Sequence, residues 1–83
     1  MFSQKIYADI ARVTQKALEE MQSRKTIDQV TVILGYVQLS SRNVPGYDAE
    51  LRAAIERLLG LARAENRREL MDALEGLLHE MDH

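Results

Sequence analysis

Apolar residues recur three and four positions apart along most of the chain, the spacing of an α-helix that is covered on one side. The repeat has three parts: Phe2, Ile6, Ile10, Val13, Ala17 and Met21; then Leu51, Ile55, Leu58 and Ala62; then Leu70, Leu74, Leu77 and Met81. No segment shows the strict alternation of a half-buried strand paired with another such segment. The pattern predicts an all-α domain.

The segment VTVILGYVQL, residues 30–39, is rich in β-branched and aromatic residues, which favour strands. A strand needs a partner, and no other segment offers one, so we predict a helix here. Its apolar stripe comprises Ile27, Val30, Ile33, Leu34 and Val37, and the predicted bundle core adds Leu51, Ile55 and Leu58. Further apolar residues lie off this stripe, at Val32, Tyr36 and Leu39. More than one neighbour must therefore cover the helix, which predicts a four-helix bundle.

The strongest turn signal is the group Asn43 to Gly46, which contains the only proline of the chain. Proline removes a backbone donor and glycine frees the backbone, so the chain must reverse there. Asp48 is a candidate N-cap for the segment that follows. The chain is thus divided into two arms.

The helical pattern weakens at residues 22–26 and again at 65–69. Neither gap contains glycine or proline, which favours a long antiparallel hairpin with helices of about 3–40 and 48–82. Such a hairpin has too little core alone and would dimerise into a four-helix bundle. The alternative is four short helices in one monomeric bundle, since Thr26 with Gln29 and Asn66 with Glu69 match capping boxes.

With 83 residues, the chain is predicted to form a single helical domain, residues 1–83. It has no cysteine to stabilise a small core, which favours burial of further surface by self-association. The 11 basic and 13 acidic residues give a net charge of −2, so general attraction for nucleic acid or an anionic membrane is not expected. We expect no signal peptide and no membrane span, and therefore a cytoplasmic protein.

Residues Thr31 to Leu39, T-V-I-L-G-Y-V-Q-L, resemble the segment after the phosphoacceptor histidine in the dimerisation and phosphotransfer hairpin of sensor histidine kinases. The resemblance implies a dimeric four-helix bundle and a place in two-component signalling. The positions that hold the histidine and its acidic neighbour in that family are Arg24 and Lys25 here. Neither side chain accepts and passes on a phosphoryl group as imidazole does, so the resemblance implies a partner of the pathway without phosphotransfer.

A cluster of charged residues spans the two polar gaps and is a candidate partner surface: Arg24, Lys25, Glu65, Arg67, Arg68 and Glu69. Acidic residues are interleaved and no aromatic residue stands among them to stack on bases, so nucleic acid is not the expected partner. His79 and His83 have a metal-ligand spacing, with Glu75 on the same face, but they stand at a fraying helix end. We expect no metal, no cofactor and no small-molecule substrate.

No phosphate-binding loop, nucleophile elbow or framed carboxylate pair occurs in the sequence, so we expect no enzyme. The predicted function is a non-catalytic helical interaction protein, a homodimer that regulates two-component signalling through protein contacts. One alternative is a small helical chaperone or adaptor that binds a partner helix. A third possibility is a nucleic-acid-binding helical dimer that uses the basic residues.

Overall fold

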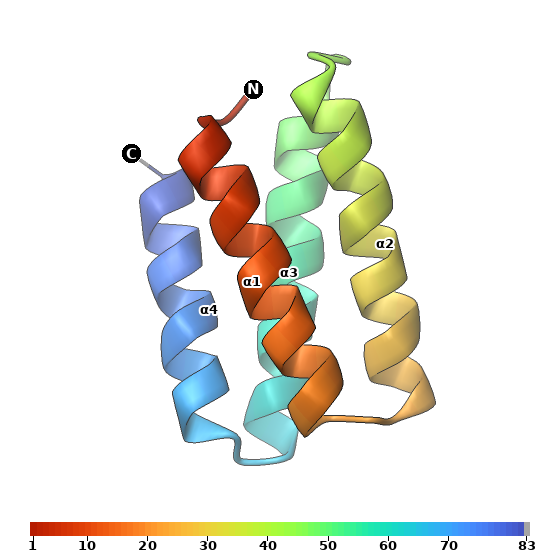
Figure 1. Cartoon of the computed structure of the whole chain (residues 1–83), viewed down its shortest axis with the longest axis vertical. Coiled ribbons are helices and arrows are strands. Elements are labelled where there is room, and N and C mark those ends of the chain that lie inside the picture. Colours follow the sequence, from red (N-terminus) through yellow and green to blue (C-terminus); the bar gives the residue numbers. More distant parts are fainter. Residues whose placement is uncertain (83) are drawn as a thin grey trace.

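A computed structural model of the 83-residue chain describes residues 1–82. The described part contains α-helices and no strand: α1 (Gln4–Glu20), α2 (Arg24–Ser41), α3 (Tyr47–Ala64) and α4 (Arg68–Met81). The helices alternate in direction and form an up-and-down bundle (Figure 1). Both α1 and α3 pack against α2 and against α4, so α2 and α4 occupy opposite corners.

The favoured long hairpin, with unbroken arms of about 3–40 and 48–82, is not the arrangement of the chain. Each arm is broken into two helices, as the alternative of four short helices in one chain predicted. The second break shows why. Asn66 adopts a left-handed conformation, with φ 58°. Its N–H donates to the carbonyl of Arg63 at 3.0 Å, and the N–H of Arg67 donates to the carbonyl of Ala62 at 3.0 Å. This is a Schellman motif, in which asparagine takes the place that glycine usually fills.

The first break uses different chemistry. The residue after α1, Met21, is extended (φ −126°, ψ 94°) and turns its side chain into the core, where it is 1% exposed. Ser23 then caps α2, because its Oγ accepts a hydrogen bond from the N–H of Thr26 at 3.2 Å. The cap is therefore Ser23 and not Thr26, whose own side chain is buried.

The predicted turn between the arms is present. The helix α2 ends in the same motif as α3, with Asn43 at φ 61° and the N–H of Val44 donating to Leu39 at 3.1 Å. Gly46, at φ 87°, stands in the N-cap position of α3, so Asp48 lies in the first helical turn and is not the cap. The left-handed glycine allows α3 to start at Tyr47, two residues after the proline.

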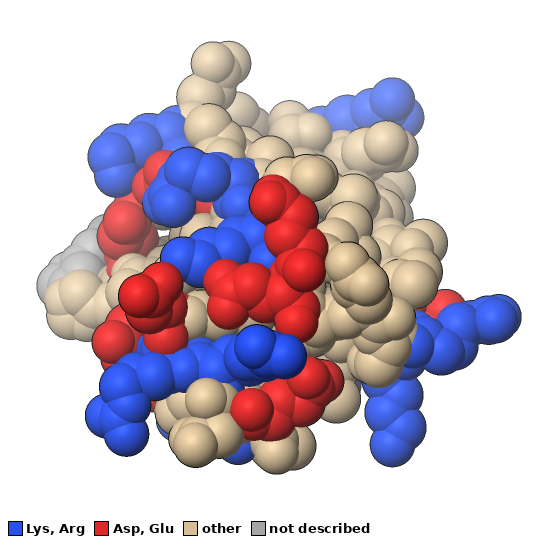
Figure 2. Space-filling model, turned by 60° about the horizontal axis from the view of Figure 1, so that its bottom comes forward, with Lys and Arg blue, Asp and Glu red and all other residues tan. Residues whose placement is uncertain are grey.

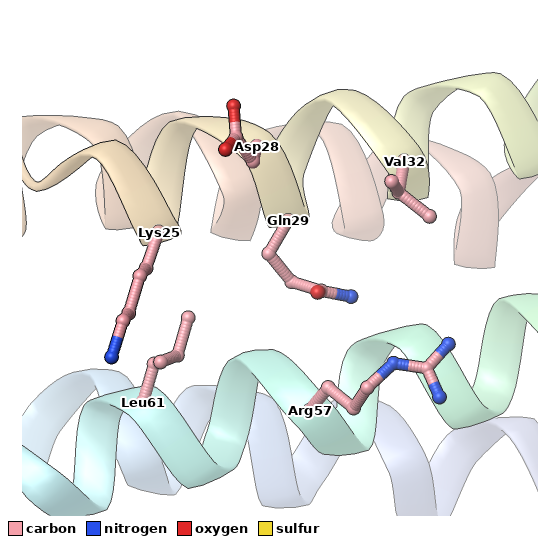
Figure 3. Close-up of a pocket in the computed structure, with 6 residues that line it drawn as sticks. All are labelled: Lys25, Asp28, Gln29, Val32, Arg57 and Leu61. Carbon is pink, nitrogen blue, oxygen red and sulfur yellow. The ribbon is translucent and has the colours of Figure 1, made fainter.

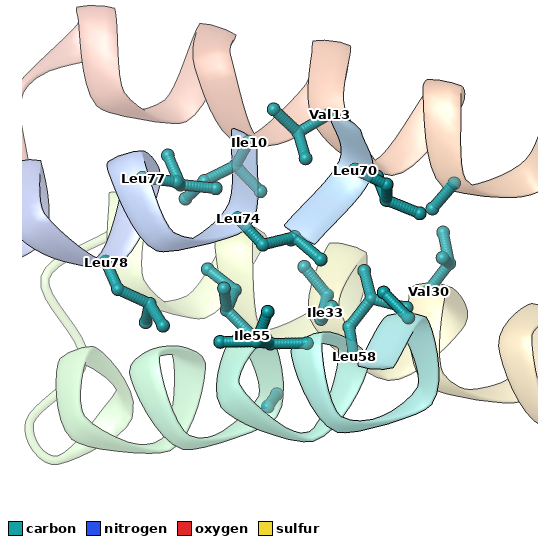
Figure 4. Close-up of a cluster of buried hydrophobic side chains, with 14 of the residues drawn as sticks. Ile10, Val13, Val30, Ile33, Ile55, Leu58, Leu70, Leu74, Leu77 and Leu78 are labelled. Atoms are coloured by element: carbon teal, nitrogen blue, oxygen red, sulfur yellow. The ribbon is translucent and has the colours of Figure 1, made fainter. Parts of the chain in front are cut away.

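The core lies inside one chain and draws on all four helices, whose apolar side chains converge in Figure 4. Ile10 from α1, Ile33 from α2, Ile55 from α3 and Leu74 from α4 are each 0% exposed. The expectation that a second chain is needed to cover Ile33 is therefore wrong. In the hairpin prediction a partner's helices would cover this side of α2 and α3; here α1 and α4 cover it.

Most of the predicted core residues are buried: Val30, Ile33, Leu51, Ile55 and Leu58. Val37 is half-buried. Two predictions are wrong, because Ile27 is 45% exposed and Leu34 is 42% exposed.

The buried stripe of α2 has a different course from the predicted one. It runs through Thr26, Val30, Ile33 and Ser40, so hydroxyl residues take positions at which the hydrophobic pattern shows nothing. The Thr26 hydroxyl lies 2.9 Å from the Ser23 hydroxyl, and Ser40 donates to Asp48 at 2.5 Å. Because these hydrogen bonds satisfy both groups, their burial carries no large penalty. The helix is thereby rotated, which places Ile27 and Leu34 at the surface.

Candidate interaction surface

Charge is distributed unevenly over the bundle, and α4 carries most of its interhelical ion pairs. Lys5 and Lys16 of α1 reach Glu80 and Glu69 of α4 at 3.2 and 3.5 Å. From α3, Arg52 donates to both carboxylate oxygens of Asp82, at 2.6 and 2.7 Å. In Figure 2, acidic and basic side chains crowd one side of the molecule and an adjoining area carries none.

The opposite corner, at α2, is held in another way. In the part of the chain that the structure describes, the ion pair on α2 joins Arg24 and Asp28 within the helix itself, at 3.3 Å. Contact with the neighbouring helices is apolar or uses hydrogen bonds from uncharged side chains of α2, such as those from Gln29 Nε2 to the carbonyl of Ala54 at 3.0 Å and from Ser40 to Asp48 at 2.5 Å. From Gln29 to Ser41 the helix has no charged residue. Both flanks of α2 are therefore candidate contact surfaces.

The first flank adjoins α1, and we call it the α1/α2 face. Its exposed members are all uncharged: Gln4, Ala11 and Gln15 from α1, and Ile27, Thr31, Leu34, Gln38 and Ser41 from α2. The hydroxyls of Thr31 and Ser41 donate to carbonyls of their own helix, at 2.9 and 3.0 Å. Neither hydroxyl therefore needs a partner from outside. Loss of charged residues at exposed positions is typical of the centre of a protein–protein interface.

The second flank adjoins α3 and forms the α2/α3 groove, with a volume of about 370 Å³. Its lining residues are Lys25, Asp28, Gln29, Val32, Arg57 and Leu61. Val32, which is 39% exposed, and the half-buried Leu61 supply apolar surface. Figure 3 shows the side chains of Lys25 and Arg57 toward opposite ends of the groove.

A chain of hydrogen bonds ties three helices together near the α2–α3 turn. The Tyr7 hydroxyl lies 2.6 Å from the hydroxyl of Ser40, which donates to Asp48 at 2.5 Å. The α-ammonium of Met1 lies 2.9 Å from the other carboxylate oxygen. The Ser40 hydroxyl, and after it the Met1 ammonium, hold the pKa of Asp48 below its usual value. The arrangement resembles a structural tie more than a reactive site, because every hydroxyl in it has a partner.

The charged residues predicted as one partner surface lie near one end of the bundle, at its two lower loops in Figure 1, and they are not joined into one network. Arg67 pairs with Glu65 at 3.9 Å, whereas Glu69 pairs with Lys16 and Arg24 pairs with Asp28. Sequence reasoning missed Lys16 and Asp28 as partners. The signal for Asp28 was its position four residues after Arg24 in a helix.

Arg24 and Lys25, which the sequence resemblance predicts to stand where sensor kinases have the phosphoacceptor pair, are exposed in the first turn of α2. His79 is exposed on α4, and His83 lies outside the described residues. Among residues 1–82, no group of three or more histidine, cysteine, aspartate and glutamate side chains is placed to hold a metal ion. No helix in that range is both long enough and apolar enough to cross a membrane.

Comparison with known proteins gives no relative from which the use of these surfaces follows. No family model matches the chain, and neither a curated protein nor a solved structure is similar to it.

Proposed function

We propose that this protein is a non-catalytic interaction module that forms a homodimer through the α1/α2 face. The observation that carries the proposal is the pair of large apolar side chains, Ile27 and Leu34, exposed by 45% and 42% on the uncharged α1/α2 face. A single exposed leucine is ordinary on a protein surface, whereas two large apolar side chains on an uncharged face are typical of a contact site.

The size of the face fits this role. The longer helix, with 18 residues, is about 27 Å long, and two packed helices present a width of about 20 Å. The projected area is therefore about 500 Å², more than half of the ~800 Å² that each partner buries in a standard interface. A second copy, related by a twofold axis, presents the same uncharged surface and places no like charges opposite each other within the face.

This dimer differs from the one that the long hairpin required. In the predicted hairpin dimer, association completes the core. In the four-helix chain the core is already complete, so association covers only surface residues. We therefore expect a dimer in equilibrium with a folded monomer, at a concentration set by the affinity of the face.

The test is the mass in solution, by sedimentation or light scattering, over a hundredfold range of protein concentration. We expect the wild type to approach twice the monomer mass and Leu34→Glu and Ile27→Glu to remain monomeric, because each buries an unpaired charge in the interface. Val32→Glu is the matched control: it adds the same charge to the same helix on the other flank and leaves the dimer intact. A wild type that stays monomeric at the highest concentration refutes the proposal, as does a dimer that both face variants leave unchanged.

The resemblance of Thr31–Leu39 to sensor kinases adds a class of partner to this proposal. We propose that the module acts in the cytoplasm as a regulator that contacts a histidine kinase or a receiver domain, without phosphotransfer at Arg24 or Lys25. Binding to purified kinase and receiver domains, measured by calorimetry, tests this part. Absence of any complex would remove the signalling role and leave the dimer proposal in place.

A further inference from the structure

The α2/α3 groove holds two cations that the bundle leaves without an ion pair. Asp28 is the one acidic residue of its lining, and its carboxylate is engaged by Arg24 at 3.3 Å. Within residues 1–82, neither Lys25 nor Arg57 has an acidic side chain within ion-pair distance. Every other basic side chain of α1 and α3 has such a partner. Lys25 and Arg57 are thus two cations without an ion pair that line the same groove.

The groove also exposes aliphatic side chains. Val32 and Leu61 expose aliphatic surface, and the amide of Gln29 is occupied by the carbonyl of Ala54 at 3.0 Å. In Figure 3, Leu61 lies beside Lys25 at one end of the groove, and the Arg57 side chain extends toward the end at which Val32 lies. Each end thus offers one cation and one aliphatic side chain. An occupant that complements it carries aliphatic side chains flanked by carboxylates.

The shape favours a helix over a small molecule as this occupant. A small-molecule site normally encloses most of its ligand, whereas this groove is open along the seam between two antiparallel helices (Figure 3). A helix laid along such a seam inserts one row of side chains between its two neighbours. Figure 3 shows the Arg57 guanidinium level with Val32, which follows Lys25 by seven residues, two helical turns or about 10 Å. Glutamates two turns apart on an incoming helix match this length.

We propose that the α2/α3 groove binds an acidic amphipathic helix of another protein, with aliphatic residues against Val32 and Leu61 and carboxylates at Lys25 and Arg57. This site lies on the flank of α2 that the α1/α2 face does not use. The protein can therefore bind such a helix whether it is a monomer or a dimer.

The probe is a synthetic 18-residue helical peptide with leucines on one side and glutamates flanking them two turns apart, labelled with a fluorophore. A second peptide, with lysine in place of every glutamate, is the matched probe. We expect the acidic peptide to bind, with an affinity that falls as salt is raised, and the basic peptide to bind at least tenfold more weakly. Amide chemical-shift changes in the protein should follow residues 25–32 and 57–61.

Variants of the protein locate the site. Lys25→Glu combined with Arg57→Glu should lower the affinity for the acidic peptide at least tenfold. It should also reduce the difference in affinity between the acidic and the basic peptide. Val32→Glu should also lower the affinity for the acidic peptide. Arg68→Glu, a charge reversal at an exposed position of α4, should leave its affinity unchanged.

Leu34→Glu separates this proposal from the homodimer, because it should abolish association and leave peptide binding intact. The groove proposal is overturned if the acidic peptide does not bind, if both peptides bind equally, or if the double charge reversal leaves the affinity unchanged. Each result is independent of the mass measurements on the α1/α2 face.

Discussion

The left-handed backbone at Asn66 predicts the sign of a stability difference between two variants at this position. That sign distinguishes two short helices from one continuous helix in the second arm. At φ 58° a side chain with a β-carbon is strained by about 1–2 kcal/mol, while glycine has no such strain. We therefore expect Asn66→Gly to be more stable than Asn66→Ala by about 1 kcal/mol. In a helix interior the order is reversed, because alanine is favoured over glycine there by about 1 kcal/mol.

Gly60 supplies the matched control. It lies inside α3 with no atom within 4 Å of the position that a β-carbon would take, so Gly60→Ala should stabilise the protein by about 1 kcal/mol. The same pair of residue types thus has opposite effects at two positions six residues apart in the sequence. For a domain of this size, 1 kcal/mol corresponds to about 4–8 °C in Tm.

The assay is thermal unfolding followed by circular dichroism, with urea unfolding to give the free energy of unfolding. We expect Asn66→Gly to melt above Asn66→Ala by several degrees, with equal helical content. A higher Tm for Asn66→Ala, together with increased helicity and doubled mass, would mean that residues 65–67 extend α3 into α4. The long hairpin would then be the better description of the chain.

Two further predictions concern the core and the tie near the α2–α3 turn. Ile33→Ala should lower the free energy of unfolding, measured in urea, by about 2–5 kcal/mol, because Ile33 is fully buried. Leu34→Ala should lower the free energy of unfolding of the monomer by about 0.5 kcal/mol or less, because Leu34 is exposed. Equal losses of stability would contradict the observed rotation of α2. Asp48 has a folded pKa below its ordinary value, so its hydrogen bonds stabilise the protein above the unfolded pKa of 3.8 and this stabilisation is lost as the pH falls through the folded value. Asp48→Asn should accordingly reduce the difference in stability between pH 7 and pH 3, and an unchanged difference would exclude this carboxylate as its source.

The sequence alone determined the helical class, the reversal at residues 43–46 and most of the core. Leu51, Ile55 and Leu58 follow the helical period without interruption, so their burial could be read from spacing. The turn was equally predictable, because proline and glycine restrict the backbone by their covalent structure. These features follow from residues that are close together in the sequence, so they could be predicted without knowing which helices pack together.

The tertiary structure decided where the arms break and which side of α2 is buried. Asn66 ends a helix only because its backbone enters the left-handed region, which asparagine permits but does not require. Ser40 can lie in the core only because Tyr7 and Asp48, from two other helices, complete its hydrogen bonds. That contact between distant segments rotates α2 and exposes Ile27 and Leu34. The spacing of residues within α2 does not predict it.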